Sequence, residues 1–136
     1  MLRTFILLGF LLVNLLATAQ PRPTREELRA ALKEASFNEK FEVANGFMFD
    51  KIYGEALFVW EIILEEDPNN ANILYKTGMC LIYLNREIEA ITYFERAQYA
   101  VSKTYNPYSS LERNAPPEIY YYLAKSNHSK GNIDTA

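Results

Sequence analysis

Residue types that carry out most enzyme chemistry are scarce in this chain of 136 residues. His128 is the only histidine and Cys80 the only cysteine, and neither lies in a recognisable nucleophile motif. Catalysis needs several reactive groups held in fixed positions, and the sequence contains no glycine-rich phosphate loop and no HExxH or CxxC motif. We therefore expect a protein that is not an enzyme and that binds no cofactor.

The remaining reactive side chains have simpler structural explanations. The adjacent pairs Glu26–Glu27 and Glu65–Glu66 could supply an acid and a base, but their helical surroundings put them on solvated helix faces. A metal at His128 would need partner ligands that the spacing does not provide, so we expect no metal site. Cys80 lies in an apolar helical stretch, which is typical of a small buried residue, and a single cysteine cannot form an intramolecular disulfide.

The composition is that of one ordinary globular domain, with 49% hydrophobic and 23% charged residues. The formal net charge is −3 and no long run of one sign occurs, so we expect no nucleic-acid partner.

The first nineteen residues have the pattern of a secretory signal peptide. Arg3 precedes the apolar run Phe5–Leu16, and the small residues Ala17-Thr18-Ala19 follow it, which predicts cleavage before Gln20. An uncleaved membrane anchor is the weaker alternative, because a spanning helix needs about 20 apolar residues. We expect an exported protein.

Residues 20–36 are predicted to form an exit segment and a leader helix. Thr24 stands three residues before Glu27, which is the spacing of a capping box at a helix start. The apolar residues that follow have helical spacing: Leu28, Ala31, Leu32 and Ala35.

From residue 37 the sequence repeats itself at a constant offset, and side chains of similar size coincide. The matching pairs are Ala44 with Gly78, Phe47 with Leu81, Ala56 with Ala90, Trp60 with Phe94, and Ile63 with Ala97. This size pattern and a period of about 34 residues are typical of the tetratricopeptide (TPR) repeat, a pair of antiparallel helices. The sequence therefore predicts an all-α fold, an α-solenoid of helix hairpins with complete repeats at about 37–70 and 71–104.

Within the second repeat, three residues carry specific expectations. Asn72 is expected to cap the first helix, or the helix starts within one or two residues of it. Gly78 costs helix stability, which indicates that the neighbouring helix leaves no room for a β-carbon. The second helix is expected to extend to Val101, and an extended loop is expected over Ser102–Pro117.

A third, incomplete repeat is predicted over residues 117–136. Its first helix is expected at Glu118–Ser129, with Tyr120, Leu123 and Ala124 facing inward and a turn at Gly131-Asn132. Its second helix is expected to open at Ile133 and lacks nearly all of its length, so we expect these residues to be the N-terminal part of a longer protein.

Several motifs of the repeats occur together in one group of exported proteins. They are Phe41-x-x-Ala44-Asn45-x-Phe47, Tyr53-x-x-Ala56-x-x-x-Trp60, Glu66-Asp67-Pro68-Asn69-Asn70-Ala71-Asn72, Tyr75-Lys76-x-Gly78-x-Cys80, the loop Ser109–Pro117, and Glu118-x-Tyr120-Tyr121-Tyr122-Leu123-Ala124. From Phe37 to Ala136 the chain resembles the TPR-containing, OmpA-like outer-membrane-associated proteins common in Bacteroidetes. This resemblance implies a periplasmic TPR array that is followed by a β-propeller and by a C-terminal domain that holds peptidoglycan.

A partner groove is expected along the first helix of each repeat. Its candidate residues are Phe41, Asn45, Met48, Tyr75, Met79, Ile82, Tyr121, Lys125 and His128. An aromatic and methionine-rich groove suits an apolar helix or an extended peptide, although the same side chains could simply pack in the core. The lysine of carboxylate-clamp TPR proteins is replaced by Phe41 and Tyr75, so a C-terminal carboxylate is not the expected ligand.

Three functions are compatible with these residues. The first is a non-catalytic scaffold that binds a protein or peptide partner in the periplasm, with peptidoglycan or the outer membrane held by further domains. The second is a structural spacer at the N-terminus of an exported enzyme whose catalytic domain lies beyond residue 136. The third is a capture module for an envelope glycan or lipid.

Overall fold

The computed structural model describes residues 21–134, and the regular secondary structure of this part is helical. The helices are α2 (Arg25–Leu32), α3 (Phe37–Phe49), α4 (Tyr53–Glu66), α5 (Ala71–Tyr83), α6 (Glu87–Ala97) and α7 (Ile119–Asp134). The expected all-α class is confirmed. The predicted signal peptide, residues 1–19, lies outside the described residues, as does Ala136.

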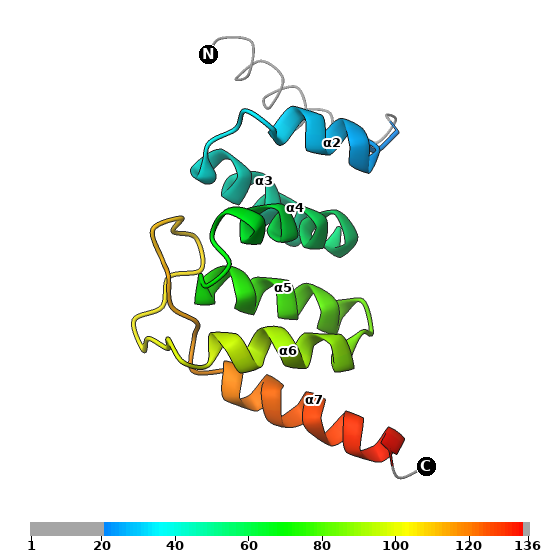
Figure 1. The fold of residues 1–136 in the computed structure, drawn as a ribbon, viewed down its shortest axis with the longest axis vertical. Coiled ribbons are helices and arrows are strands. Elements are labelled where there is room, and N and C mark those ends of the chain that lie inside the picture. Colours follow the sequence, from blue (N-terminus) through cyan, green and yellow to red (C-terminus); the bar gives the residue numbers. More distant parts are fainter. Residues whose placement is uncertain (1–20, 135–136) are drawn as a thin grey trace.

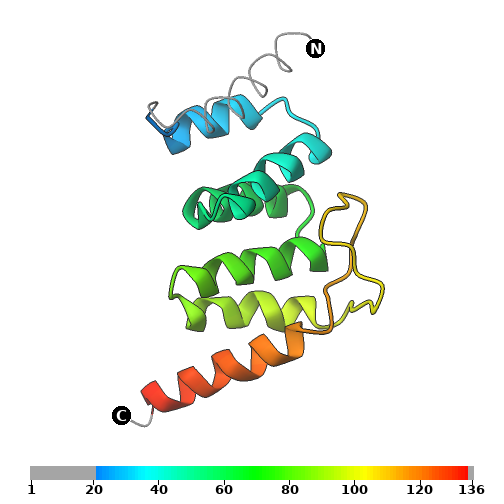
Figure 2. The same cartoon turned by 180° about the vertical axis from the view of Figure 1, so that it is seen from behind.

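The helices follow one another along the long axis of the molecule, from α2 at one end to α7 at the other (Figures 1 and 2). The extensive helix contacts join consecutive elements, namely α3 with α4, α4 with α5, α5 with α6, and α6 with α7. Helix α2 covers the end of this stack, where the guanidinium groups of Arg25 and Arg29 lie 5.4 and 5.3 Å from the centre of the Phe58 ring on α4.

The first two helices begin with reciprocal caps. Thr24 Oγ1 accepts a hydrogen bond from Glu27 N at 3.2 Å, while Glu27 Oε2 accepts one from Thr24 N at 2.8 Å, so the predicted capping box is confirmed. Ser36 and Glu39 form the same arrangement at the start of α3. In both boxes the hydrogen bond from the cap backbone lowers the pKa of the glutamate.

The turns after α3 and α5 have the same geometry at positions that are 34 residues apart. Lys51 has φ 61° and Asn85 has φ 58°, both in the left-handed region. Ile52 N donates to Phe47 O at 2.8 Å, and Arg86 N donates to Leu81 O, also at 2.8 Å. This hydrogen bond, which closes the helix end around a left-handed residue, is that of the Schellman motif.

Aromatic packing in the core follows the same offset. Trp60 is fully buried, with its ring centre 5.4 Å from that of Phe41. Phe94 is also fully buried, with its ring centre 6.2 Å from that of Tyr75. A β-carbon on Gly78 would lie 2.8 Å from Cζ and 2.9 Å from Cδ1 of Phe94, with Cε1 nearer still. The expected absence of space for a side chain at Gly78 is therefore confirmed.

Two expectations for the second repeat are corrected by the structure. The cap of α5 is Asn70, whose Oδ1 accepts a hydrogen bond from Ile73 N at 3.3 Å. Asn72 lies inside the helix and is fully buried. Helix α6 ends at Ala97, so Val101 is not helical and instead pairs with Ala115 in an isolated β-bridge.

Helix α7 also differs from the expectation in its facing residues and its length. Ile119 and Ser126 are fully buried, whereas Tyr120 is 54% exposed and Ala124 is exposed. The inward stripe is therefore formed by Ile119, Tyr122, Leu123 and Ser126, which have helical spacing. The backbone continues through Gly131 to Asp134 without a positive φ, so the turn predicted at Gly131-Asn132 is absent from the described part of this helix.

Candidate functional site

The segment between α6 and α7 leaves the stack and returns along its side. We name residues 102–117 the crossing loop. In Figures 1 and 2 it runs from the end of α6 past the start of α5 to the level of α3 and α4. Its two ends are joined by hydrogen bonds from Ala115 N to Ala100 O at 2.7 Å and from Ser102 N to Ala115 O at 3.0 Å.

Lys76, on α5, makes a buried contact with the crossing loop. Its side chain is buried, with only 5% of the residue exposed. Its Nζ donates to the backbone oxygen of Pro107 at 2.8 Å and to Asn45 Oδ1 on α3 at 2.9 Å. The ammonium group also lies 5.4 Å and 5.5 Å from the ring centres of Phe41 and Trp60. Because none of these partners is a carboxylate, burial lowers the pKa of Lys76 to about 8.

Asn72, one turn earlier on α5, makes a second contact with the crossing loop. It is fully buried, and both the nitrogen and the oxygen of its side-chain amide form hydrogen bonds. Nδ2 donates to the backbone oxygen of Glu112 at 3.2 Å, and Oδ1 accepts a hydrogen bond from the hydroxyl of Tyr105 at 2.7 Å. The ring of Tyr105 packs edge-on against Tyr75, with centres 6.1 Å apart. Burial raises the pKa of both tyrosines.

Three polar contacts hold the edge of the crossing loop. Ser110 Oγ donates to Asn38 Oδ1 on α3 at 2.6 Å. Arg113 forms an ion pair with Asp67 at 2.7 Å, and the hydrogen bond from Arg113 lowers the pKa of Asp67. The backbone oxygen of Arg113 accepts a hydrogen bond from the first amide of α5, that of Ala71, at 3.1 Å.

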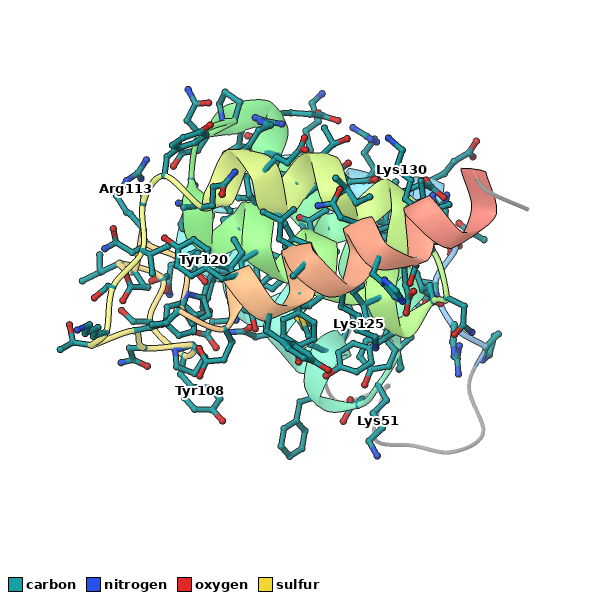
Figure 3. The ribbon with its side chains drawn as sticks, turned by 90° about the horizontal axis from the view of Figure 1, so that it is seen from below. Lys51, Tyr108, Arg113, Tyr120, Lys125 and Lys130 are labelled. Carbon is teal, nitrogen blue, oxygen red and sulfur yellow. The ribbon has the colours of Figure 1, made fainter. Side chains whose placement is uncertain are left out.

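The apolar side chains near the tip of the loop point away from the helices. Tyr108 is 79% exposed and Leu111 is 89% exposed. Figure 3, seen from the α7 end, shows Tyr108 and Arg113 at the side of the stack where the loop lies. The loop is therefore held by Tyr105, by polar side chains and by its backbone, and its tip adds little to the hydrophobic core.

The nine expected groove residues fall into three groups. Phe41 and Met79 are buried in the core, and Met48 and Ile82 pack partly against it. Asn45 and Tyr75 are half-buried and contact the crossing loop. Tyr121, Lys125 and His128 are exposed on α7, where Lys125 Nζ lies 3.8 Å from Glu87 Oε1. The structure thus brings Asn45 and Tyr75 together at the loop, separately from the three residues on α7.

The residues of this contact that were missed from the sequence are Asn38, Asp67, Asn72 and Lys76, which bind the loop, and Tyr105, which belongs to it. Asn38 and Asn72 are separated by the same offset of 34 residues that relates Ala44 to Gly78. That shared offset could have indicated that both asparagines have the same role. Nothing in the spacing indicates that Tyr105 packs against α5.

A cluster of tyrosines continues from this contact region to the surface. The Tyr53 and Tyr83 rings stack with centres 4.4 Å apart. Tyr122 lies 6.5 Å from Tyr75 and 5.3 Å from Tyr121, again between ring centres. Tyr83 is 50% exposed and Tyr121 is 65% exposed, so this side of the molecule presents aromatic surface to solvent.

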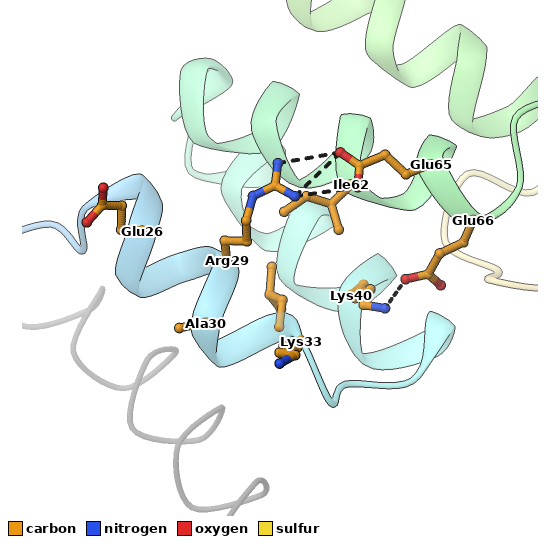
Figure 4. Close-up of a pocket in the computed structure, with 9 residues that line it drawn as sticks. Glu26, Arg29, Ala30, Lys33, Lys40, Ile62, Glu65 and Glu66 are labelled. Atoms are coloured by element: carbon orange, nitrogen blue, oxygen red, sulfur yellow. Dashed lines mark hydrogen bonds and ion pairs between the residues drawn. The ribbon is translucent and has the colours of Figure 1, made fainter.

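A separate hollow of about 530 Å³ lies between α2 and the hairpin of α3 and α4 (Figure 4). Its walls carry both signs of charge, and these charges are paired across it. Arg29 lies 3.4 Å from Glu65, and Lys40 forms an ion pair with Glu66. Because the charged groups neutralise one another, the hollow offers no excess charge to a ligand.

The thiol of Cys80 is buried. Burial raises the pKa of the Cys80 thiol to about 12, so it stays protonated at neutral pH and is a poor nucleophile. Between residues 21 and 134, no group of three or more His, Cys, Asp or Glu side chains is placed to hold a metal ion. In the same part of the chain, no helix has the length and apolar character to cross a membrane.

Comparison with known proteins gives no match: no family model, no curated protein and no solved structure is significantly similar to this chain. Its function must therefore be inferred from its own residues and geometry.

Proposed function

We propose that this chain is a non-catalytic scaffold of the bacterial cell envelope. It is an exported TPR module, an α-solenoid in which α3–α4 and α5–α6 are two complete repeats and α7 begins a third. It binds a protein or peptide partner on the face formed by the first helices of these repeats, α3, α5 and α7. As the resemblance implies, further domains of the protein hold the assembly at the outer membrane and peptidoglycan.

The equivalence of two turns carries this proposal. Lys51 and Asn85 occupy matching positions of the two repeats, share a left-handed backbone, and are followed by the same 2.8 Å hydrogen bond that ends the preceding helix. Two unrelated helix pairs have no reason to share both the period and the turn. Proteins built from such repeats generally present an extended surface for binding other proteins.

The exposed tyrosines support a protein partner. Tyr83 and Tyr121 leave half or more of their surface in water, on the side where Tyr122 links α7 to Tyr75 of α5. Tyrosine combines a large apolar ring with a hydroxyl group, which is why it is enriched among the residues that dominate protein interfaces.

An affinity capture with matched variants tests this function. The secreted chain is immobilised, and proteins of a bacterial envelope extract are recovered and identified. We expect a specific partner that is lost with the double variant Tyr83→Ala and Tyr121→Ala. The control carries Ile88→Ala and Tyr99→Ala, which remove two exposed side chains on and just after α6 and should leave capture unchanged.

Equal capture by both variants, or no specific partner, would argue against the scaffold. Reading the gene beyond residue 136 gives an independent check. A propeller or OmpA-like domain supports the scaffold, whereas a hydrolase domain supports a spacer role.

A further inference from the structure

Part of the proposed binding face is covered by the chain itself. The crossing loop lies on α3 and α5, and it leaves α7 and the exposed tyrosines open. We infer that the covered part is a binding site for an extended peptide of the type Tyr-x-Pro, and that the crossing loop occupies this site as an internal, replaceable ligand. This inference rests on the proposed function and names the chemistry of the partner.

Several of the contacts between the helices and the loop are made to its main chain. Lys76 Nζ donates to Pro107 O at 2.8 Å, and Asn45 Nδ2 reaches the same oxygen at 3.5 Å. Asn72 Nδ2 donates to Glu112 O at 3.2 Å. Every peptide carries such carbonyl groups, so these donors can bind another extended chain in the same way. The side-chain amides and the ammonium group are therefore arranged as a peptide-binding surface.

Tyr105 supplies the side-chain specificity of this contact. Its hydroxyl donates to Asn72 Oδ1 at 2.7 Å while its ring packs against Tyr75. Pro107 follows two residues later, and its ring favours an extended backbone at the preceding residue. A tyrosine followed two residues later by proline thus presents a hydroxyl, a ring and a carbonyl at the spacing that Asn72, Tyr75 and Lys76 accept.

The geometry of the loop allows it to leave without disturbing the helices. Its base is closed by the hydrogen bonds between Ala100, Ser102 and Ala115, so both ends stay in place when the tip moves. Compact loops with closed ends are often functional elements. Tyr108 and Leu111 already point into solvent, so lifting the tip exposes little additional apolar surface from these two residues.

A peptide supplied from outside tests the site. The probe is a fluorescein-labelled peptide with the sequence of residues 104–114. The opened variant of the complete secreted chain carries Tyr105→Ala, Ser110→Ala and Arg113→Ala, which remove contacts from the loop and leave the helix residues intact. In the unaltered chain only the fraction of molecules with a lifted loop can bind the peptide, so the apparent affinity is reduced in proportion to that fraction. We therefore expect the opened variant to bind the peptide saturably and at least about tenfold more tightly than the unaltered chain does.

Two further variants control for binding elsewhere. Adding Asn72→Ala to the opened variant should lower its affinity for the peptide at least about tenfold, because the hydroxyl of the peptide's tyrosine then has no acceptor at this position. Tyr108→Ala in the unaltered chain removes a tyrosine from the same loop without freeing the site, so its peptide affinity should equal that of the unaltered chain. Circular dichroism establishes that each variant is folded.

The inference is overturned if the folded, opened variant does not bind the peptide, binds it no tighter than the unaltered chain, or keeps its affinity when Asn72 is replaced. Should the triple variant not fold, the milder pair Ser110→Ala and Arg113→Ala must still bind more tightly than the unaltered chain.

The outcomes also separate this site from the scaffold function. Peptide binding without any envelope partner would support the internal-ligand site and count against the scaffold. Capture of a partner through Tyr83 and Tyr121 without any peptide binding would overturn the internal-ligand site and leave the scaffold standing.

Discussion

Gly78 on α5 lies against the ring of Phe94 on α6, and a β-carbon on Gly78 would be within 2.9 Å of three of the ring atoms. Phe94 is fully buried, so its ring cannot turn aside into solvent. The closeness of these two helices thus depends on the absence of one side chain, in a helix where glycine is otherwise unfavourable.

Replacing Gly78 by alanine should therefore destabilise the fold. Alanine gains about 1 kcal/mol of helix propensity, but overpacking of a tight core costs about 1–3 kcal/mol or more. We expect a net loss in the free energy of unfolding, measured by urea denaturation. Gly54→Ala is the matched control, because no atom lies within 4 Å of its added β-carbon. A Gly78→Ala variant as stable as Gly54→Ala would contradict the close packing.

The hydroxyl of Tyr105 should contribute measurably to stability. Tyr105→Phe removes the donor to Asn72 Oδ1 and leaves that buried oxygen without this partner. The expected loss is about 1–2 kcal/mol in the free energy of unfolding. Tyr108→Phe, in the same loop but 79% exposed, should change stability by less than about 0.5 kcal/mol. Indistinguishable unfolding curves for the two variants would show that the loop is not held through Asn72.

Lys76 should make stability depend on pH in an unusual direction. Its pKa is about 8 when folded, against 10.5 for the ordinary side chain, so above pH 8 the unfolded chain binds more protons than the folded chain. Linkage then requires the free energy of unfolding to rise with pH, by about 1 kcal/mol between pH 7 and pH 9. Burial of Cys80 raises its pKa above the ordinary 9.0, so this group opposes the trend from about pH 8 upward, as the unfolded thiol begins to ionise.

Comparison with Lys76→Met isolates this contribution, because Cys80 and the buried tyrosines are present in both proteins. The difference between the two free energies of unfolding should grow in favour of the unaltered chain from pH 7 to pH 9. A constant difference over this range would mean that Lys76 titrates normally and is not buried beneath the crossing loop.

Features that depend on local sequence could be predicted correctly. Thr24 and Glu27 cap α2 through residues three apart, and Gly78 meets Phe94 within one hairpin. Trp60 and Phe94, which the period of the sequence matches, are both fully buried beside an aromatic ring of the preceding helix.

Features that depend on distant segments could not be predicted. Asn72 has the side chain of a helix cap, but it is buried inside α5 because Tyr105 and Glu112 of the crossing loop satisfy its amide from far along the chain. The facing residues of α7 depend on how that helix rolls against its neighbours, and a shift by one position exchanges Tyr120 for Ile119 at the buried face. Groove residues expected from the repeat pattern were consequently divided between the core, the loop contact and the open surface.

A substitution at Gly131 distinguishes a continuous helix α7 from the turn that was predicted at Gly131-Asn132. In a continuous helix, Gly131→Ala removes the entropic cost of glycine and meets no atom within 4 Å, so the free energy of unfolding should rise by about 0.5–1 kcal/mol. In a turn that needs glycine's left-handed backbone, the same change would lower it by about 1 kcal/mol or more. Urea denaturation gives the sign, and far-UV circular dichroism shows whether helix content is kept. Since the two geometries predict opposite signs, a loss of stability would place the end of α7 before Gly131.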